Sequence, residues 1–213
     1  MNFISDALNL YVENHTDEES ELLKKIYRDT QADVIMPRMI SGHFQGKLLS
    51  MFVAMIRPEF ILELGTFTGY SAICMAENLQ ENGKIFTIDI NEELETRVRK
   101  YFLDSGFNSK INYIIGDALN IISSFNFEFD LVFIDADKKN NLNYYNLVFE
   151  KVKKGGFIIT DNVLWSGKVV EQNIKKDKDL EAILAFNDFV KADKRVKNIL
   201  LPIRDGLLVA QKI

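Results

Sequence analysis

Two kinds of hydrophobic spacing divide the chain near Pro58. From Ser5 to about Ile56, apolar residues mostly recur at the three- and four-residue spacing of amphipathic helices. Thr16 or Asp17 is placed to cap the second of these helices, and a third helix is expected over 44–55, before Pro58. The N-terminal part of the chain is therefore predicted to be helical.

After Pro58, short apolar runs rich in Ile, Val and Phe alternate with helix-length amphipathic segments. Nearly continuous apolar runs predict strands buried on both faces, as in a parallel sheet covered by helices. This alternation favours a doubly wound α/β fold. The expected strands are 60–64, 84–89, 111–115, 131–135 and 157–161, and the expected helices between them are 70–79, 92–105, 119–125 and 142–152.

The C-terminal section changes this rhythm. A helix near 180–190 is followed by apolar runs at 196–201 and 207–213, which only a short turn separates. Two strands joined by so short a turn must be antiparallel. The sequence thus predicts one mostly parallel, seven-stranded sheet with an antiparallel last strand. We expect a single domain over 1–213, with a helical part (1–56) and a core (57–213).

Composition narrows the class of protein. The 213 residues are 47% hydrophobic and 27% charged, as in ordinary globular proteins, and the net charge of −5 disfavours a nucleic-acid partner. Cys74 is the only cysteine, so neither an internal disulfide nor a cysteine-based zinc site is expected. The first residues lack a basic signal region and no apolar stretch could span a membrane. These features predict a cytoplasmic protein without a membrane partner.

Acidic residues gather where the predicted strands end. Glu63, Asp89, Asp135 and Asp161 each stand at the end of a different strand. In open α/β sheets, ligands bind in the crevice outside the carboxyl ends of the strands. We therefore expect these carboxylates to face one crevice.

The turn after the first strand carries Gly65 and Gly69. Glycines in this place let the backbone turn tightly and approach a ligand. Asp89 follows Gly69 by 20 residues, the spacing of a carboxylate that binds ribose hydroxyls. Both a nicotinamide dinucleotide and S-adenosylmethionine suit this arrangement.

Two side chains favour S-adenosylmethionine. Phe67 stands where the dinucleotide pattern G-x-G-x-x-G has the glycine that admits a pyrophosphate. Glu63 would repel a pyrophosphate but attract the cationic amino group and sulfonium of S-adenosylmethionine. A nicotinamide-dependent dehydrogenase on a similar sheet is the alternative.

A second group of residues suits a metal ion. Asp135, Asp161 and Asn162 would offer three hard oxygen ligands, a set that fits Mg²⁺, with Mn²⁺ or Ca²⁺ as other options. An Asx turn after the strand is the other interpretation of Asp161 and Asn162. Lys138 is either a solvated lysine or a base that takes a proton from a metal-bound hydroxyl.

Several motifs together resemble one known family, the cation-dependent O-methyltransferases of the caffeoyl-CoA and catechol O-methyltransferase group, especially small bacterial members. The resemblance covers nearly the whole chain. It is most specific in D-A-D-K at 135–138 and D-N-V-L-W-S-G at 161–167. It also includes the segments 36–39, 45–49, 62–71, 88–89, 116–118, 143–145, 155–156 and 201–206.

The resemblance implies a class I methyltransferase fold and a set of roles. It implies that Glu63 lies near the methionine part of S-adenosylmethionine, that Asp89 binds its ribose and that Lys138 is the base. Trp165 would line the acceptor pocket, with plain packing as the other interpretation. The remaining implied cofactor contacts are Ser41, Gly65, Thr66, Ser71, Ala118 and Asp135, and the implied metal ligands are Asp135, Asp161 and Asn162.

The implied reaction is methyl transfer from S-adenosylmethionine to a hydroxyl of a catechol-type small molecule, assisted by a divalent cation. The family is typically dimeric, so the apolar N-terminal helices are expected to face a second copy. A non-catalytic or nucleic-acid-directed methyltransferase relative is the remaining alternative. The three metal-ligand candidates and Lys138 count against lost catalysis, and the negative charge counts against nucleic acid.

Overall fold

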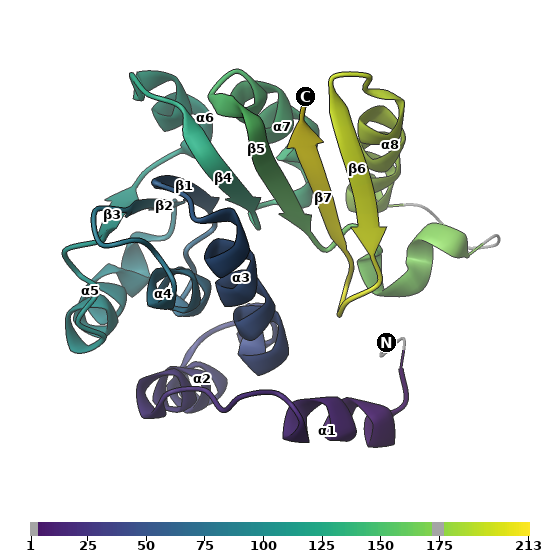
Figure 1. Cartoon of the computed structure of the whole chain (residues 1–213). Helices are drawn as coiled ribbons and strands as arrows, with labels where there is room; N and C mark the ends of the chain where they lie inside the picture. The colour runs from purple at the N-terminus through teal and green to yellow at the C-terminus, as the bar shows by residue number, and fades with distance from the viewer. Residues whose placement is uncertain (1–3, 172–176) are drawn as a thin grey trace.

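One mixed sheet forms the centre of the protein in the computed structural model of the chain (Figure 1). Within residues 4–171 and 177–213, which the structure describes, seven strands pair in the order β3-β2-β1-β4-β5-β7-β6. Strands β1 to β5 are parallel, and β7 is antiparallel to both β5 and β6. The predicted fold class, including the antiparallel last strand, is confirmed. The strands are β1 (Phe60–Leu64), β2 (Lys84–Asp89), β3 (Ile111–Ile115), β4 (Phe129–Ile134), β5 (Val152–Asp161), β6 (Val196–Leu201) and β7 (Leu207–Lys212).

Helices cover both faces of this sheet. In Figure 1, α3, α4 and α5 lie in front of it, and α6, α7 and α8 lie behind. The helices are α1 (Asp6–Asn14), α2 (Glu21–Asp33), α3 (Gly42–Ile56), α4 (Tyr70–Glu77), α5 (Glu95–Asp104), α6 (Ala118–Ile121), α7 (Asn141–Phe149) and α8 (Lys178–Ala192). Short 3₁₀ turns are η1 (Pro37–Met39), η2 (Glu92–Leu94), η3 (Ile122–Ser124), η4 (Lys138–Asn140) and η5 (Trp165–Val170).

Strand β1 shows why the predicted strands are apolar along their whole length. Ile61 belongs to the hydrophobic core in front of the sheet, together with residues of α3 and α4. Its neighbours Leu62 and Leu64 belong to the core behind the sheet, with residues of α7 and α8. All three side chains are fully buried. A strand with helices on both faces needs apolar residues at successive positions.

Several predicted bounds differ: the helix expected over 142–152 ends at Phe149, and the strand expected over 131–135 is Phe129–Ile134, so that Asp135 follows it. Two further differences have a clear cause. Strand β5 begins at Val152, because Val152 pairs with Phe129 of β4 ahead of a register shift. The polar run 153–156 hid this extension, since lysines and glycines are typical of a turn. The predicted caps of α2 are wrong: Ser20 accepts a hydrogen bond from Leu23 N, whereas Thr16 Oγ1 donates to Val12 O.

The first helix differs from the others in having no buried residue. Its apolar side chains Leu8, Leu10 and Tyr11 are about half exposed or more. Helix α2, in contrast, buries Leu23 and Ile26 against the front core. None of the helices in the described residues has the length and apolar character needed to cross a membrane.

Candidate active site

A pocket of about 1390 Å³ opens at the carboxyl ends of the parallel strands. The loops after β1, β2, β3, β4 and β5 all contribute to its wall. This is the edge at which sheets of this kind bind ligands. The candidate residues that line the pocket are Gly65, Asp89, Ala118, Asp135, Lys138, Asp161, Asn162 and Trp165.

The glycine turn after β1 fits closely against the loop after β4. Gly65 has φ of +98°, and a Cβ there would lie 2.1 Å from the carbonyl oxygen of Asp135. Its N–H donates to Ile88 O at 2.9 Å, which ties the turn to the end of β2. Only glycine fits at this position, and its backbone is left open toward the pocket.

Glu63 is fully buried and lies outside the pocket lining. Its carboxyl accepts hydrogen bonds from Ser71 Oγ at 2.6 Å and from Thr87 Oγ1. Burial raises the pKa of Glu63 to about 8, against the lowering effect of these two bonds. At neutral pH the carboxyl is therefore largely protonated until a cation approaches it.

Three other cofactor candidates also lie outside the pocket lining. Thr66 and Ser71 are buried next to Glu63, and Thr66 Oγ1 lies 2.5 Å from Thr87 Oγ1. Ser41 is buried at the start of α3, where its side chain makes no capping hydrogen bond. The predicted cofactor residues thus fall into two sets: some line the pocket, and the others are buried behind its wall.

Asp89 links the glycine turn to the end of β2. Its Oδ2 accepts a hydrogen bond from Phe67 N at 2.6 Å, and its Oδ1 accepts one from Asn91 N at 2.8 Å. These bonds fix the carboxylate at the pocket wall, and each oxygen keeps a lone pair for a hydroxyl. Phe67 itself has φ of +48°, so the phenylalanine that replaces a glycine still adopts a left-handed conformation.

The acidic ends of β4 and β5 hold the remaining candidates. Lys138 Nζ donates to Asp135 Oδ1 at 3.0 Å, and the two side chains are only 11% and 18% exposed. Burial raises the pKa of Asp135, Lys138 lowers it, and the nearby charge of Asp161 raises it. Asp161 is 4% exposed and accepts a hydrogen bond from Gln45 Nε2 at 2.7 Å.

This donor set fits a divalent cation. Two close, largely buried carboxylates repel each other, and a dication would relieve that repulsion. The main-chain N–H of Asn162 donates to Asp161 Oδ1 at 2.6 Å, whereas its side-chain amide makes no hydrogen bond among the described residues, so the side-chain oxygen can coordinate. The same part of the chain holds no group of three His, Cys, Asp or Glu that suits a metal, so a cation at this place would need the Asn162 side-chain oxygen beside the two carboxylates.

Trp165 lines the pocket beside these residues. Its backbone has φ of +47°, and its indole Nε1 is buried without a hydrogen-bond partner in the described residues. Lys168 Nζ lies 6.0 Å from the ring centroid. Trp165 thus adds an apolar side chain to the wall of the pocket that the carboxylates also line.

Sequence reasoning missed three residues of this region. Gln45 is a buried polar residue on α3, and its partner Asp161 is 116 residues away. Arg204 and Asp205 line the pocket from the turn between β6 and β7. Segments 45–49 and 201–206 belong to the family resemblance, but it assigned these three residues no role, and the Pro and Gly of 202–206 indicate only a turn.

Known proteins share this architecture along the whole chain. The family model for O-methyltransferases matches residues 13–213. Caffeoyl-CoA O-methyltransferase of Eucalyptus gunnii is 33% identical over 223 residues, covering 98% of this chain and 88% of the relative. Caffeoyl-CoA O-methyltransferase 2 of Petunia hybrida is 32% identical over 224 residues, covering 98% and 91%. The crystal structure of the O-methyltransferase from Bacillus cereus in complex with SAH has a TM-score of 0.89 and 28% identity, over 97% of both chains.

The sheet, its pocket and these neighbours define the class of protein, a methyltransferase with a Rossmann-like core. Within that class, the chain belongs to the O-methyltransferase family and is of caffeoyl-CoA type. This result excludes the alternative of a nicotinamide-dependent dehydrogenase.

Proposed function

We propose that this O-methyltransferase methylates one hydroxyl of a catechol-type small molecule with the help of a divalent cation, Mg²⁺ in the first place. The observation that carries the proposal is the grouping of Asp135, Asp161 and Asn162 beside Lys138. Two carboxylates and an amide suit a cation that also binds two vicinal oxygens of an acceptor.

The methyl donor is S-adenosylmethionine, since the family transfers methyl groups and the Bacillus cereus relative is a complex with SAH. In the proposal, Asp89 accepts hydrogen bonds from the ribose hydroxyls and Ala118 flanks the adenine. The Gly65–Thr66 backbone and Asp135 border the methionine part. Glu63, which accepts a hydrogen bond from Ser71, balances the positive charge of the methionine part. Ser41 is a further contact of the cofactor.

The residues proposed to hold the cation are Asp135, Asp161 and Asn162. When bound there, the cation lowers the pKa of the acceptor hydroxyl. Lys138 Nζ is the group that takes the proton from this hydroxyl, and Trp165 keeps the aromatic ring in place. The acceptor oxygen then forms a bond to the methyl carbon while the bond from that carbon to sulfur breaks, leaving S-adenosylhomocysteine.

Metal binding tests this proposal directly. Titration calorimetry with Mn²⁺ in the presence of S-adenosylhomocysteine should show one site per chain. Asp161→Ala should weaken Mn²⁺ affinity at least about tenfold and leave S-adenosylhomocysteine affinity almost unchanged. Asp104→Ala, at an exposed position of α5 outside the pocket lining, is the matched control. Equal Mn²⁺ affinity in Asp161→Ala and wild type would contradict the metal assignment.

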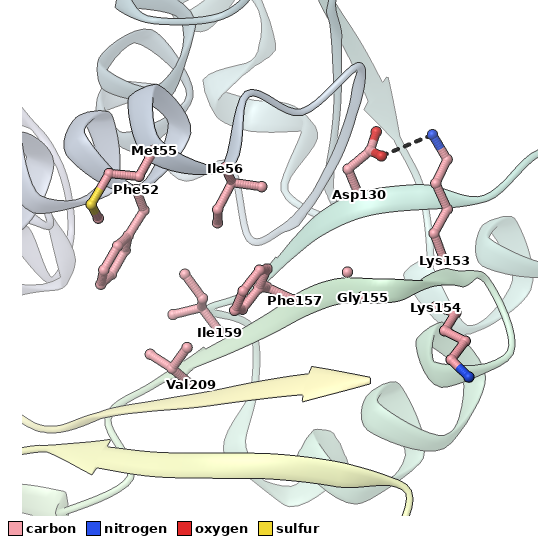
Figure 2. Close-up of a pocket in the computed structure, with 11 residues that line it drawn as sticks. Phe52, Met55, Ile56, Asp130, Lys153, Lys154, Gly155, Phe157, Ile159 and Val209 are labelled. Atoms are coloured by element: carbon pink, nitrogen blue, oxygen red, sulfur yellow. Dashed lines mark ion pairs between the residues drawn. The ribbon is translucent and has the colours of Figure 1, made fainter. Parts of the chain in front are cut away.

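We also propose that the protein is a homodimer. Figure 1 shows no helix of the described chain in front of β7 and β6. A pocket of about 580 Å³ opens on this side, between Phe52 and Met55 of α3 and Phe157 and Val209 of the sheet (Figure 2). Ile199 of β6 pairs with Val209 and is 57% exposed. This bare face carries the apolar side chains of Ile199, Val209 and Phe157, with the polar Lys197 and Gln211 at its far end, and a partner would cover the apolar part.

Helix α1 supports a second copy as that partner. A nine-residue helix without a buried residue gains little from its own chain. Its charged residues are acidic, whereas Lys154 and Lys197 stand at the edge of the bare face. Lys153 stands there too but is already paired with Asp130 at 2.8 Å. In this proposal, residues 1–56 supply acceptor and dimer contacts, and residues 57–213 form the catalytic core of the single domain.

A further inference from the structure

The segment that follows β5 has an unusual backbone. The φ angle is positive at Asn162 (60°), Trp165 (47°), Ser166 (52°) and Gly167 (83°). A left-handed conformation costs a residue with a Cβ atom roughly 1 kcal/mol or more. Segment 162–167 therefore needs contacts that hold it, and it carries two residues of the pocket wall, Asn162 and Trp165.

The turn between β6 and β7, residues 202–206, supplies such contacts. Leu164 N donates to Asp205 O at 2.8 Å, and Val163 N donates to Gly206 O at 3.3 Å. The two backbones lie so close that a Cβ on Gly206 would be 2.5 Å from Leu164 Cγ. Gly206 also has φ of +90°, so this approach requires glycine.

Asp205 adds a side-chain contact to these backbone bonds. Its Oδ1 accepts a hydrogen bond from Ser166 N, next to Trp165. Burial and the charge of Asp161 raise the pKa of Asp205, and the bond from Ser166 lowers it. The carboxyl lines the same pocket as the proposed metal ligands and holds the segment that carries one of them, Asn162.

The same turn is anchored on its other side. Arg204 Nη1 donates to Ile40 O at 3.0 Å, in the residue before Ser41. Asp205 thus extends from a turn that is fixed to both the sheet and the start of α3. A fixed support is what a residue needs in order to orient a neighbouring loop.

We propose that Asp205 is a positioning residue of the active site. Through its bond to Ser166 it sets the backbone of segment 162–167, which directs Asn162 toward the cation and Trp165 toward the acceptor. The inference rests on the proposed function, because Asn162 is one of the proposed metal ligands.

Trp165 makes the segment directly observable, since it is the only tryptophan in the chain. Asp205→Ala should shift the emission maximum of Trp165 to longer wavelength and lower its anisotropy, because the ring loses its fixed position. Asp205→Asn keeps an acceptor oxygen and should restore the wild-type spectrum. Unchanged emission and anisotropy in Asp205→Ala would overturn the proposal, and so would an Asp205→Asn spectrum like that of Asp205→Ala.

Metal affinity gives the second measurement. Asp205→Ala should weaken Mn²⁺ binding by about 10- to 100-fold, the usual effect of removing a group that orients a metal ligand. S-adenosylhomocysteine binding should stay at the wild-type level, which shows that the variant is folded. Asp193→Ala is the matched control: Asp193 accepts a bond from Arg195 N before β6, outside the pocket lining. Its Mn²⁺ affinity should equal that of the wild type, and an equal loss in both variants would overturn the proposal.

A measurement on the wild-type protein covers the case in which Asp205→Ala does not fold. The Ser166 amide should exchange its hydrogen slowly, although the residue is exposed, and unprotected exchange would overturn the proposal. Failure of the proposed function looks different: the wild type would bind no Mn²⁺, while the Trp165 spectra would still separate Asp205→Ala from Asp205→Asn.

Discussion

Burial gives the Glu63 carboxyl an unusual charge state. The pKa of Glu63 rises from 4.5 to about 8, so the folded protein holds this proton more tightly than the unfolded chain does. The resulting stabilisation is complete below pH 4.5 and is lost as the pH rises to about 8.

The wild type should therefore lose on the order of a few kcal/mol of unfolding free energy between pH 5 and pH 8, relative to Glu63→Gln. The amide of Gln does not titrate and can still accept a hydrogen bond from Ser71 or Thr87. Urea unfolding of both proteins across this pH range provides the comparison. Parallel stability profiles would show that Glu63 has an ordinary pKa.

In our account Lys138 acts as a general base, a role for which a positive charge alone is not enough. Lys138→Arg keeps a cation beside Asp135, but arginine does not give up its proton in proteins. Both Lys138→Arg and Lys138→Ala should lower kcat by about 10²- to 10⁴-fold, the usual contribution of a general base. Steady-state kinetics and S-adenosylmethionine binding separate this effect from lost affinity. Wild-type kcat in Lys138→Arg would assign the lysine an electrostatic role only.

At the scale of elements, the β1–α4 turn joins the sheet to the cofactor side of the pocket. Gly65→Ala would place a methyl group 2.1 Å from Asp135 O at φ of +98°, so the turn and the loop after β4 have to separate. We expect a loss of roughly 2 kcal/mol or more of stability and a marked loss of S-adenosylmethionine affinity.

Gly106→Ala is the matched control for this turn. Gly106 also has a positive φ, +75°, but a Cβ there meets nothing within 4 Å. This variant should show only the conformational cost of about 1 kcal/mol and normal cofactor affinity. Thermal unfolding and calorimetry measure both effects, and equal losses in the two variants would contradict the close approach at Gly65.

The elements also show what the sequence could predict. Strand β1 was predictable because Ile61, Leu62 and Leu64 enter two cores, which requires a continuous apolar run. The first residues of β5 were not, because the strand begins where Val152 pairs with Phe129 of β4, and the polar residues 153–156 lie at the register shift that follows.

Some site residues were predictable from the sequence and others were not, for similar reasons. Asp89, Asp135 and Asp161 stand at strand ends, so their arrival at one pocket follows from parallel topology. The bond between Gln45 and Asp161 spans 116 residues, and that between Asp205 and Ser166 spans 39. Such partners depend on how α3 and the β6–β7 turn pack, which hydrophobic periodicity does not encode.

At the scale of the whole molecule, the bare face of β7 and β6 predicts the assembly. Wild-type protein should sediment at twice the 24.5 kDa chain mass. Ile199→Glu would place a charge in the proposed interface and should give monomers that still bind S-adenosylhomocysteine. Leu103→Glu is the control, because Leu103 is 64% exposed on α5. A monomeric wild type, or dissociation by Leu103→Glu as well, would contradict the assigned interface.

The central claim is that one pocket combines a methyl donor, a divalent cation and a catechol-type acceptor. The most direct test is transfer of labelled methyl from S-adenosylmethionine to 3,4-dihydroxybenzoate, measured with Mg²⁺ and again with EDTA. Our account predicts a methyl ether in the presence of Mg²⁺ and a loss of turnover in EDTA that added Mg²⁺ restores. Turnover that continues unchanged in EDTA would contradict the role given to Asp135, Asp161 and Asn162.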